Sequence, residues 1–565
     1  MNVLKFLIGL CLGCILIAMP LSQFQPDSLD SLRTLAVQLD GRKKPLDTVA
    51  RETVAKIYGS TTYTSAEGNT EDALSTYLSL WFNTRNWNEE PIVLVSYRPL
   101  KEAVGLDLDR KHFTFQEVMA NAKLGTLVRQ ARDAQLNDET LSRDRREALT
   151  IEDRLTLLFN SVGNTHLPIV PHPSDPKGTW FGIADAQQLY SPEAVAPSIA
   201  QFEVMQQTLL RGGTSHLSIV GQLATEFKQS LQALSQNIYP ADSILEREVH
   251  FNRFHPFAKA WILYSIAFAI AVASFWLKPW NLYWSAIGLF TAGIGVQSYG
   301  FLLRMQIAGR PPVTNMYESV VWVGFGIAAI ALAFELISRA RYYLIAAAPL
   351  AVACLLLADS LPAVLDPSIA PLVPVLRDNF WLSVHVPTIA LSYASFALAF
   401  GLGHVALGNT LFAPHASQRF KTLSQLNYRV LQVGVLLLTA GIILGGIWAH
   451  FSWGRFWGWD PKETWALIAL LCYLVPLHGR LVGWIGDFGV NVASIVSFNA
   501  VLMAWYGVNF VLGTGLHSYG FGTGGSELLI AGVVGLDLLF VSIVAVRHAG
   551  WLQRPTIRTP ELSSN

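Results

Sequence analysis

The sequence predicts an all-α polytopic membrane protein with about ten transmembrane helices and a soluble, mainly helical external domain after the first of them. Three observations support this prediction. Apolar residues make up 52% of the chain and charged residues only 14%, well below the roughly 25% charged residues of an average globular protein. Of the 80 charged residues, 53 precede position 258. The remainder contains repeated apolar runs of about the length that spans a bilayer.

Residues 1–20 are expected to form an N-terminal transmembrane anchor or a signal segment. Lys5 precedes an apolar run from Phe6 to Met19, and both kinds of segment start with a positive charge followed by an apolar stretch. No clear small-residue cleavage site follows, which favours an anchor. Either form sends the next segment across the membrane, because a positively charged start is retained inside.

Residues 21–256 are expected to form the soluble, mainly helical external domain. This segment is polar, shows helical periodicity and contains prolines that are typical of loops. Its most distinctive stretch runs from Leu39 to Thr48, where Asp40-Gly41 favours a tight turn. Asp47 or Thr48 is expected to cap the helix that follows, and this structural role is favoured over a binding site.

Residues 257–550 are expected to form the membrane domain, and residues 551–565 a cytoplasmic tail. Nine further apolar runs occur here, each near the roughly 20 residues that a spanning helix needs. They lie at about 258–277, 281–302, 319–338, 342–360, 380–404, 429–449, 464–479, 490–512 and 527–546.

Alternating these runs from an external domain places the basic residues between the helices on the inner side, as the positive-inside rule requires. These residues are Lys278, Arg339, Arg341, Arg419, Lys421, Arg429, Arg480 and Arg547. The same topology places four segments outside, at 309–318, 362–385, 451–463 and 513–526.

Charge and cysteine usage exclude two classes of protein. The formal net charge is zero, whereas a nucleic-acid partner usually requires a strong basic excess on some surface. Cys11, Cys14, Cys354 and Cys472 all lie in apolar segments, so we expect them to act as small hydrophobic side chains and not as a disulfide framework. Asp537 stands alone in the last apolar run without an evident partner, and an intramembrane carboxylate is a functional candidate by default.

The segment between the sixth and seventh of these runs is rich in aromatic residues. Four tryptophans and a phenylalanine occur within thirteen residues, together with four charged residues and two glycines, in the sequence WGRFWGWDPKETW from Trp453 to Trp465. An interfacial aromatic belt would account for one or two tryptophans. A denser cluster with charges and glycines favours a binding surface for a flat aromatic ligand that carries acidic groups.

This loop carries a resemblance to a known family. The run WGRFWGWDPKETWALI is similar to the tryptophan-rich WWD signature of haem-handling proteins, and its DPKETWAL ending resembles the CcsA (ResC) family of System II cytochrome c biogenesis more than the System I relatives CcmC and CcmF. The stretch from Arg310 to Ser319, RPPVTNMYES, resembles the N-x-Y-E-S loop of the same family. The resemblance covers residues 280–546, and the segment before them resembles, less specifically, an extension found in larger members.

The resemblance implies that haem b is bound as substrate at the outer face. It implies axial iron ligands at His385 and His517, with the haem ring over a surface made by Trp453, Trp457, Trp459, Asp460 and Trp465. Two neutral imidazoles would give six-coordinate iron. The alternative is that each histidine is a satisfied core residue.

His478 is implied to be a third ligand, at an inner site where haem first enters. Thirteen residues separate it from Trp465, so at about 1.5 Å per residue it lies roughly 20 Å below the tryptophan loop. The alternative is a histidine that reaches the inner interface beside Arg480. His450 is a minor candidate ligand, and His250 and His255 are expected to be interface residues.

The resemblance implies haem transport to the outer face and covalent attachment of haem to c-type apocytochromes that carry C-x-x-C-H. No residue is expected to act as a catalytic acid or base, because positioning would supply much of the acceleration. The resemblance also implies a CcsB (ResB)-like membrane subunit and a bacterial inner membrane, with the WWD segment and the N-terminal domain in the periplasm. A haem carrier or exporter without ligation activity is the alternative, and a non-haem transporter or structural subunit with an aromatic girdle is a third.

Overall fold

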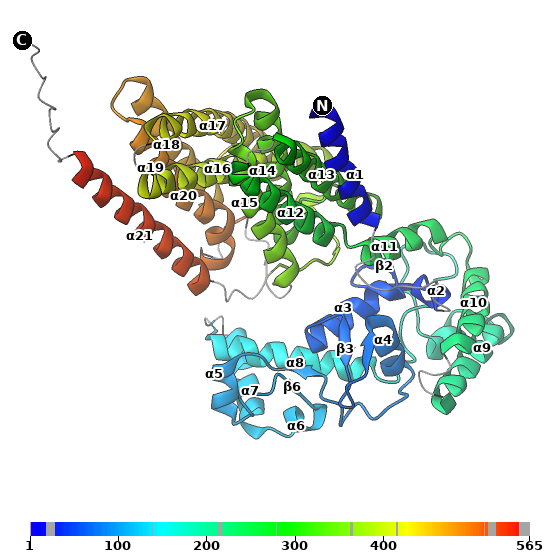
Figure 1. Ribbon diagram of the computed structural model, residues 1–565. Helices are drawn as coiled ribbons and strands as arrows, with labels where there is room; N and C mark the ends of the chain where they lie inside the picture. Colours follow the sequence, from blue (N-terminus) through cyan, green and yellow to red (C-terminus); the bar gives the residue numbers. More distant parts are fainter. Residues whose placement is uncertain are drawn as a thin grey trace, which may run out of the picture. The chain divides into compact units, whose positions relative to one another are not determined.

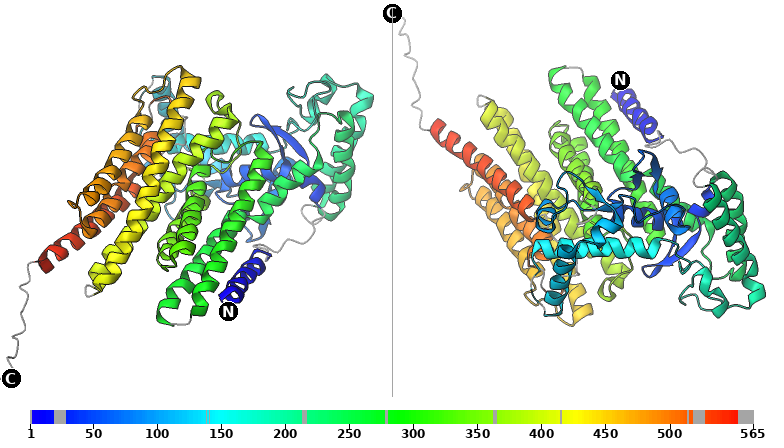
Figure 2. Two further views of the ribbon diagram at one scale, coloured as in Figure 1. Left: turned by 90° about the horizontal axis from the view of Figure 1, so that it is seen from above. Right: turned by 90° about the horizontal axis from the view of Figure 1, so that it is seen from below.

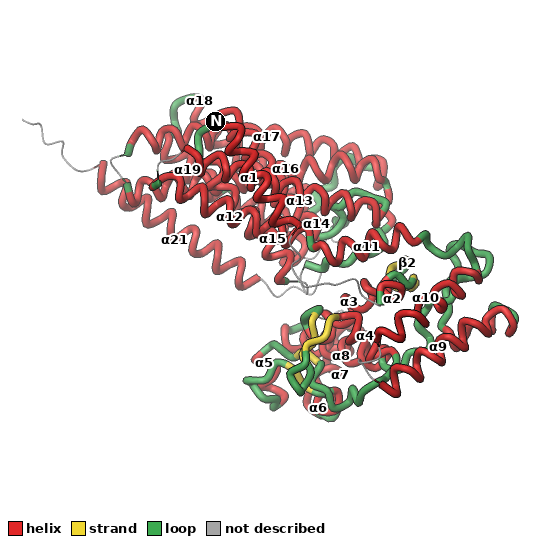
Figure 3. The backbone as a smooth tube through the Cα atoms, turned by 45° about the vertical axis from the view of Figure 1, so that its right-hand side comes forward, coloured by secondary structure: helices red, strands yellow, loops and turns green. Residues whose placement is uncertain are grey.

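The computed structural model describes residues 2–18, 29–137, 139, 141–212, 217–277, 280–361, 365–413, 416–512, 515–517 and 527–552. These residues are mainly helical, with three two-stranded sheets (Figure 3). They divide into two compact units, which we call the membrane unit (Met1–Met19, His255–Pro367, Leu372–Asn565) and the polar unit (Pro20–Phe254, Ser368–Pro371). The predicted cytoplasmic tail lies outside the described residues, apart from the end of the last helix.

The membrane unit is a bundle of long helices (Figures 1 and 2). Its elements are α1 (Asn2–Ala18), α12 (Pro256–Trp276), α13 (Trp280–Ala308), α14 (Met316–Ser338), α15 (Tyr343–Ser360), the short 3₁₀ helix η3 (Pro374–Arg377), α16 (Asn379–Phe412), α17 (Ser417–Trp453), α18 (Pro461–Leu481), α19 (Asp487–Val496), α20 (Phe498–Leu502), the π-helix η4 (Met503–Leu512) and α21 (Glu527–Leu552).

Nine helices in the described part of the chain are long and apolar enough to cross a membrane, and a shorter apolar helix covers Leu4–Ile17. Each of the nine predicted runs falls on one of them, the eighth run being α19, α20 and η4 in succession. The predicted class, an all-α polytopic membrane protein, is therefore confirmed.

Close helix approaches in this bundle depend on glycine. A Cβ added at Gly9 of α1 would lie 2.2 Å from the carbonyl oxygen of Ser285 on α13. A Cβ at Gly441 of α17 would lie 2.5 Å from Cδ1 of Ile389 on α16. Small residues let helix backbones approach closely where lipid supplies no hydrophobic driving force for association. The glycines thus allow α1 to pack against α13, and α17 against α16.

The polar unit contains shorter elements. They are α2 (Asp30–Arg33), β1 (Ala36–Leu39), β2 (Arg42–Pro45), α3 (Leu46–Tyr58), β3 (Thr62–Thr64), β4 (Thr70–Asp72), α4 (Ala73–Trp81), β5 (Val93–Leu94), α5 (Arg98–Val104), β6 (His112–Phe113), α6 (Phe115–Met119), α7 (Ala122–Leu136), α8 (Arg143–Ser161), the 3₁₀ helix η1 (Ile183–Gln188), α9 (Pro192–Gly212), α10 (Leu217–Leu234) and α11 (Asp242–Phe254). The sheets are antiparallel pairs, β1 with β2, β3 with β4 and β5 with β6.

The predicted turn at Asp40-Gly41 joins β1 to β2. Leu39 pairs with Arg42 across the hairpin, so the loop has two residues. Asp40 and Gly41 both have positive φ, 53° and 76°, as a type I′ hairpin turn requires. The tight turn is confirmed.

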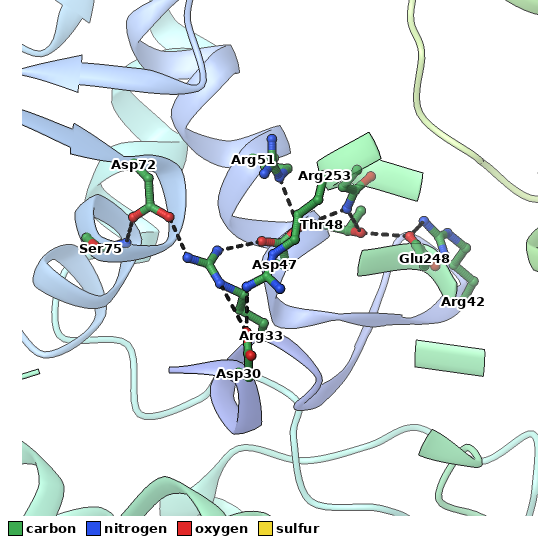
Figure 4. A network of polar contacts seen from close by, with 11 residues as sticks. Asp30, Arg33, Arg42, Asp47, Thr48, Arg51, Asp72, Ser75, Glu248 and Arg253 are labelled. Atoms are coloured by element: carbon green, nitrogen blue, oxygen red, sulfur yellow. Dashed lines mark hydrogen bonds and ion pairs between the residues drawn. The ribbon is translucent and has the colours of Figure 1, made fainter. Parts of the chain in front are cut away.

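The expectation that Asp47 or Thr48 caps the next helix is wrong. Helix α3 begins at Leu46, its N-cap is Pro45, and no side chain caps it. Asp47 is instead buried and accepts hydrogen bonds from Arg33 at 2.8 Å and from Arg51 at 2.9 Å (Figure 4). A buried carboxylate needs cations to compensate its lost hydration, and that requirement determines the role of Asp47.

The same network fastens α11 to the β1–β2 hairpin. Arg42 donates two hydrogen bonds to Glu248, at 2.8 and 2.7 Å, and Thr48 donates one at 2.8 Å (Figure 4). Asn252 of α11 donates to Asp47 at 3.0 Å. The residues of the distinctive Leu39–Thr48 stretch thus hold together segments about 200 positions apart in the sequence.

Candidate functional site

The tryptophan-rich segment is a short ordered loop between α17 and α18. Helix α17 ends at Trp453, and Gly454 adopts a φ of +71° that lets the chain leave the helix. Helix α18 begins at Pro461 with Asp460 as its N-cap and Glu463 completing a capping box. The Asp-Pro-Lys-Glu sequence therefore encodes a helix start, because it supplies an N-cap carboxylate, a proline at N1 and a glutamate at N3.

Glu463 holds the loop in shape. Its carboxylate accepts hydrogen bonds from Arg455 Nη1 at 3.1 Å and from the backbone N–H groups of Gly458 at 2.8 Å and Asp460 at 3.2 Å. The Arg455 guanidinium also lies 5.7 Å from the centroid of the Trp453 ring. The guanidinium of Arg455 is thus paired with residues of the loop itself.

Asp460 joins the loop to His517. Its Oδ1 lies 2.8 Å from Nδ1 of His517, and its Oδ2 accepts the backbone N–H of Leu516 at 2.6 Å. A Cβ at Gly515 would lie 2.4 Å from the same Oδ2. Burial raises the pKa of Asp460, but the hydrogen bonds from His517 and the backbone lower it by more, so the pKa is about 2. The carboxylate is therefore charged at neutral pH and accepts the Nδ1 proton of His517, which places the lone pair of that ring on Nε2.

His385 has the same tautomer for a different reason. It lies near the start of α16, and its Nδ1 is 2.9 Å from the carbonyl oxygen of Gly441 on α17. A carbonyl only accepts, so Nδ1 carries the proton and Nε2 the lone pair. Trp448 packs edge-on to the ring at 5.7 Å, and a Cβ at Gly445 would lie 2.6 Å from Cε1. The ring is therefore held from one side by α17.

The two histidines lie near each other. The His517 side chain is close enough to act electrostatically on the His385 ring. Both imidazoles present an Nε2 lone pair, and they come from segments more than 130 residues apart. Two such nitrogens are suitable axial ligands for a metal held between them.

The tryptophans differ in position. Trp453 packs edge-on to His517, with ring centroids 4.9 Å apart and planes at 85°. Trp457 and Trp459 contact each other at 5.8 Å and 90°, and Trp459 is 69% exposed. Trp465 is half-buried in the first turn of α18. Trp453 therefore supports the histidine, while Trp457 and Trp459 present apolar surface.

His478 lies apart from this site, near the other end of α18. Its Nδ1 is 2.9 Å from the carbonyl oxygen of Leu474 in the same helix, and the side chain is exposed. Its Nε2 is thus available too. The neighbouring Arg480 pairs with Asp487 at 2.7 Å. The structure therefore does not bring His478 together with His385 and His517.

His450 and Asp537 have partners that the sequence did not indicate. His450 stacks on Phe456, with centroids 4.3 Å apart and planes at 5°, so it acts as a packing residue of the loop. Asp537 of α21 lies 3.2 Å from Nε2 of His404 on α16. His404 was not singled out in the sequence, and the available signal was that it is another ionisable residue inside a spanning run.

The N-x-Y-E-S loop is held by a buried ion pair. Arg304 of α13 and Glu318 of α14 are 2.7 Å apart, and each side chain is 2% exposed. Glu318 also accepts from the Thr314 backbone N–H and hydroxyl, at 2.8 and 2.7 Å, and Asn315 caps α14. These contacts satisfy every charge in the pair, so the loop has a structural role.

Comparisons with known proteins bear on the same residues. The family model described as "Cytochrome C assembly protein" matches residues 313–517, a segment that contains His385 and the tryptophan loop and ends at His517. Protein NrfI of Wolinella succinogenes is 30% identical over 510 residues, which cover 85% of this chain and 53% of NrfI. The cytochrome c biogenesis protein CcsA of Microcystis aeruginosa is 35% identical over 272 residues, covering 39% of this chain and 82% of that protein. CcsA of Gloeothece citriformis is 35% identical over 297 residues, covering 42% and 89%.

Fold and site together define a multi-pass membrane protein with two hydrogen-bonded imidazoles near a tryptophan loop. The chain belongs to the cytochrome c assembly protein family. It spans about half the length of NrfI.

Proposed function

We propose that this protein binds haem b as its substrate, with His385 and His517 as axial ligands, and attaches it to c-type apocytochromes. The observation that supports the proposal is the matched tautomer of the two imidazoles. One Nδ1 proton is accepted by the Gly441 carbonyl and the other by the Asp460 carboxylate, so in each ring Nε2 carries the lone pair that would bind iron. The half-buried ring of Trp457 and the exposed ring of Trp459 would lie against the porphyrin face.

The chemistry would be a covalent ligation. The two cysteine thiols of a C-x-x-C-H segment add across the two haem vinyl groups, each thiol hydrogen going to the vinyl carbon that the sulfur does not take, and two thioethers form. The incoming histidine of that segment would replace one of the two imidazoles. The residues of this chain would hold the haem edge toward the thiols, so positioning supplies the acceleration.

The inner histidine and the partner complete the proposal. His478 presents a free Nε2 about 22 Å along α18 from Glu463, at 1.5 Å per residue. We assign it to a first haem site on the cytoplasmic side, with the tryptophan loop facing the periplasm of a bacterial inner membrane. A CcsB (ResB)-like subunit would provide further ligands and work with this chain in System II ligation.

Absorption spectroscopy of the detergent-purified protein tests the haem site. We expect the sharp reduced spectrum of low-spin haem in the wild type, its loss or broadening in His385→Ala and His517→Ala, and its retention at the outer site in His478→Ala. His450→Ala is the matched control, since that ring stacks on Phe456. A protein that binds no haem, even with a CcsB-like subunit and added haem, would contradict the proposal.

A haem carrier or exporter is the second candidate function. The separate position of His478, with an available Nε2 and an exposed side chain, favours movement of haem between two sites. Covalent product decides between the two functions. Thioether-linked haem on an added apocytochrome in a reconstituted system supports ligation, whereas transfer of extractable haem alone supports a carrier.

A further inference from the structure

The charged residues of the tryptophan loop are unequally satisfied. Arg455 is paired with Glu463, and Glu463 also accepts two backbone N–H groups. Asp460 accepts from His517 and from the backbone N–H groups of Leu516 and Lys462. Three of the four charges in this loop are therefore neutralised within the loop or by the His517 segment.

Lys462 is the exception. Its backbone N–H donates to Asp460 at 3.0 Å, but its ammonium group makes no hydrogen bond or ion pair of 4 Å or less with any residue that the structure describes. The side chain is half-buried in the first turn of α18. A partly buried ammonium without a neutralising side chain can form a charge-assisted hydrogen bond with an anionic ligand, so the position favours a bound anion.

The location of the ammonium indicates which anion. Lys462 donates its backbone N–H to Asp460, whose carboxylate lies 2.8 Å from Nδ1 of His517, and its charge acts electrostatically on the His385 ring, so this cation lies near both imidazoles. Asp460 attracts Lys462 electrostatically, yet its oxygens already accept three hydrogen bonds. A ligand seated between the imidazoles would therefore meet one uncompensated positive charge at its edge.

We infer that Lys462 binds a propionate carboxylate of the porphyrin and thereby sets which edge of the haem faces Lys462. This inference rests on the proposed function and names the recognition element of the same site. A charge-assisted hydrogen bond between ammonium and carboxylate is about twice as strong as a neutral one. With one propionate held at Lys462, the porphyrin has a single in-plane orientation, which directs the vinyl edge away from this residue.

Haem titrations of the full-length purified protein test the inference by a thermodynamic cycle. Ferric haem and its dimethyl ester, which lacks the carboxylates, are titrated into wild type, Lys462→Met and Lys462→Arg, and Kd is read from the absorption change. We expect Lys462→Met to weaken haem binding about 10-fold to 100-fold, Lys462→Arg to restore most of it, and the ester to bind wild type and Lys462→Met equally. The low-spin spectrum stays in all three proteins because the imidazoles are unchanged. Lys421→Met, at the far end of α17, is the control for removal of one positive charge.

The outcomes separate this inference from the function on which it rests. If Lys462→Met binds haem as tightly as wild type, or weakens haem and ester by the same factor, the carboxylate contact is refuted while the haem site stands. A wild-type protein that binds neither porphyrin would contradict the proposed function itself.

If added anionic lipid weakens haem binding to wild type but not to Lys462→Met, lipid phosphate competes for this ammonium, which supports an anion site there. If Lys462→Met loses affinity for anionic lipid but not for haem, and wild type binds haem and the ester equally, the anion is a lipid headgroup and the porphyrin assignment is wrong.

Discussion

At the scale of single residues, Asp460 links the helix start, the tryptophan loop and His517. One carboxylate caps α18, accepts the Nδ1 proton of His517 and holds the Leu516 backbone. Groups that orient a ligating histidine are commonly as important as the ligand itself. The position of Asp460 therefore matters to the proposed haem site although the residue would not bind iron.

We predict that Asp460→Asn weakens haem binding by about 10-fold to 100-fold, the usual effect of removing such an orienting partner. The amide keeps the shape but loses the charge that favours the Nδ1–H tautomer of His517. Haem titration followed by absorption measures the change. Asp487→Asn, which breaks the ion pair with Arg480 near the other end of α18, is the matched control. Equal Kd values for Asp460→Asn and wild type would refute this role.

In the polar unit, Asp72 makes local stability depend on pH. Burial raises its pKa, but the charge of Arg33 and the hydrogen bonds from Ser75 and Arg33 lower it more, so the pKa lies below its usual range. As pH falls, the unfolded chain takes up the proton first, and the contribution of Asp72 is lost as pH falls through the lowered pKa. Hydrogen exchange of α4 in the full chain, measured from pH 6 to pH 3, is expected to show falling protection. Asp72→Asn should flatten this dependence over the same range, and an unchanged slope would contradict the assignment.

At the scale of elements, the fold of the site depends on how closely α17 approaches α16. Gly441 supplies the carbonyl that orients His385, and Gly445 leaves room for the ring. Neither contact can form if α17 carries larger side chains at these positions. The glycines of α17 are thus part of the geometry of the site, although they carry no chemistry.

We predict that Gly445→Ala displaces the His385 ring. The added Cβ would lie 2.6 Å from Cε1 and 3.1 Å from Nδ1, and relief of such crowding typically costs about 1–3 kcal/mol. Haem affinity should fall while the helical content is retained, as measured by titration and circular dichroism. Gly408→Ala on α16 is the control, since a Cβ there meets nothing within 4 Å. Unchanged affinity in Gly445→Ala would show that the ring has another position available.

The His404–Asp537 contact is expected to hold α21 on α16. Interhelical polar contacts in membranes contribute about 0.6 kcal/mol on average and up to about 1.7 kcal/mol. A double-mutant cycle with His404→Leu and Asp537→Leu, followed by unfolding in denaturing detergent, should give a coupling in this range. Ser542→Ala on α21, whose hydroxyl bonds only within its helix, serves as the control. Fully additive effects of the two single changes would contradict the pairing.

At the scale of the whole molecule, the two units have different chemical character. The membrane unit carries the nine long apolar helices, while the polar unit is held by a network of buried ion pairs around Arg33, Asp47 and Glu248. The chain covers most of the CcsA proteins compared but about half of NrfI.

We predict that the two ends of α17 face opposite sides of the membrane, with the tryptophan loop in the periplasm. In a variant without the four native cysteines, Ser452→Cys should react with a membrane-impermeant maleimide from the periplasmic side. Gln418→Cys should react only after the membrane is disrupted. Both positions are exposed at opposite ends of the helix, so both must react in detergent. The reverse pattern would overturn the orientation derived from the positive-inside rule.

Much of the fold could be predicted because hydropathy and turn chemistry are local properties. Spanning helices satisfy their own backbone and need only length and apolar composition, and Asp40-Gly41 needs only positive φ. The site could be predicted in part. The density of aromatic residues singled out Trp453, and the family resemblance implied His385 and His517. The structure places Trp453 against His517 and His385 near them, while their role toward haem stays a prediction. The cap expected at Asp47 failed because burial beside Arg33 outweighed the local preference.

The sequence by itself determined the helical membrane class, the candidate residues and the tight turn at Asp40-Gly41. Only the tertiary structure decided how each charged or ionisable group is used. It paired Arg455 with Glu463, His517 with Asp460 and His404 with Asp537, and among the described residues it gave the Lys462 ammonium no ion-pair partner. The physical reason is that apolar length acts within one segment, whereas the partner of a buried charge comes from whichever segment the packing brings within about 3 Å.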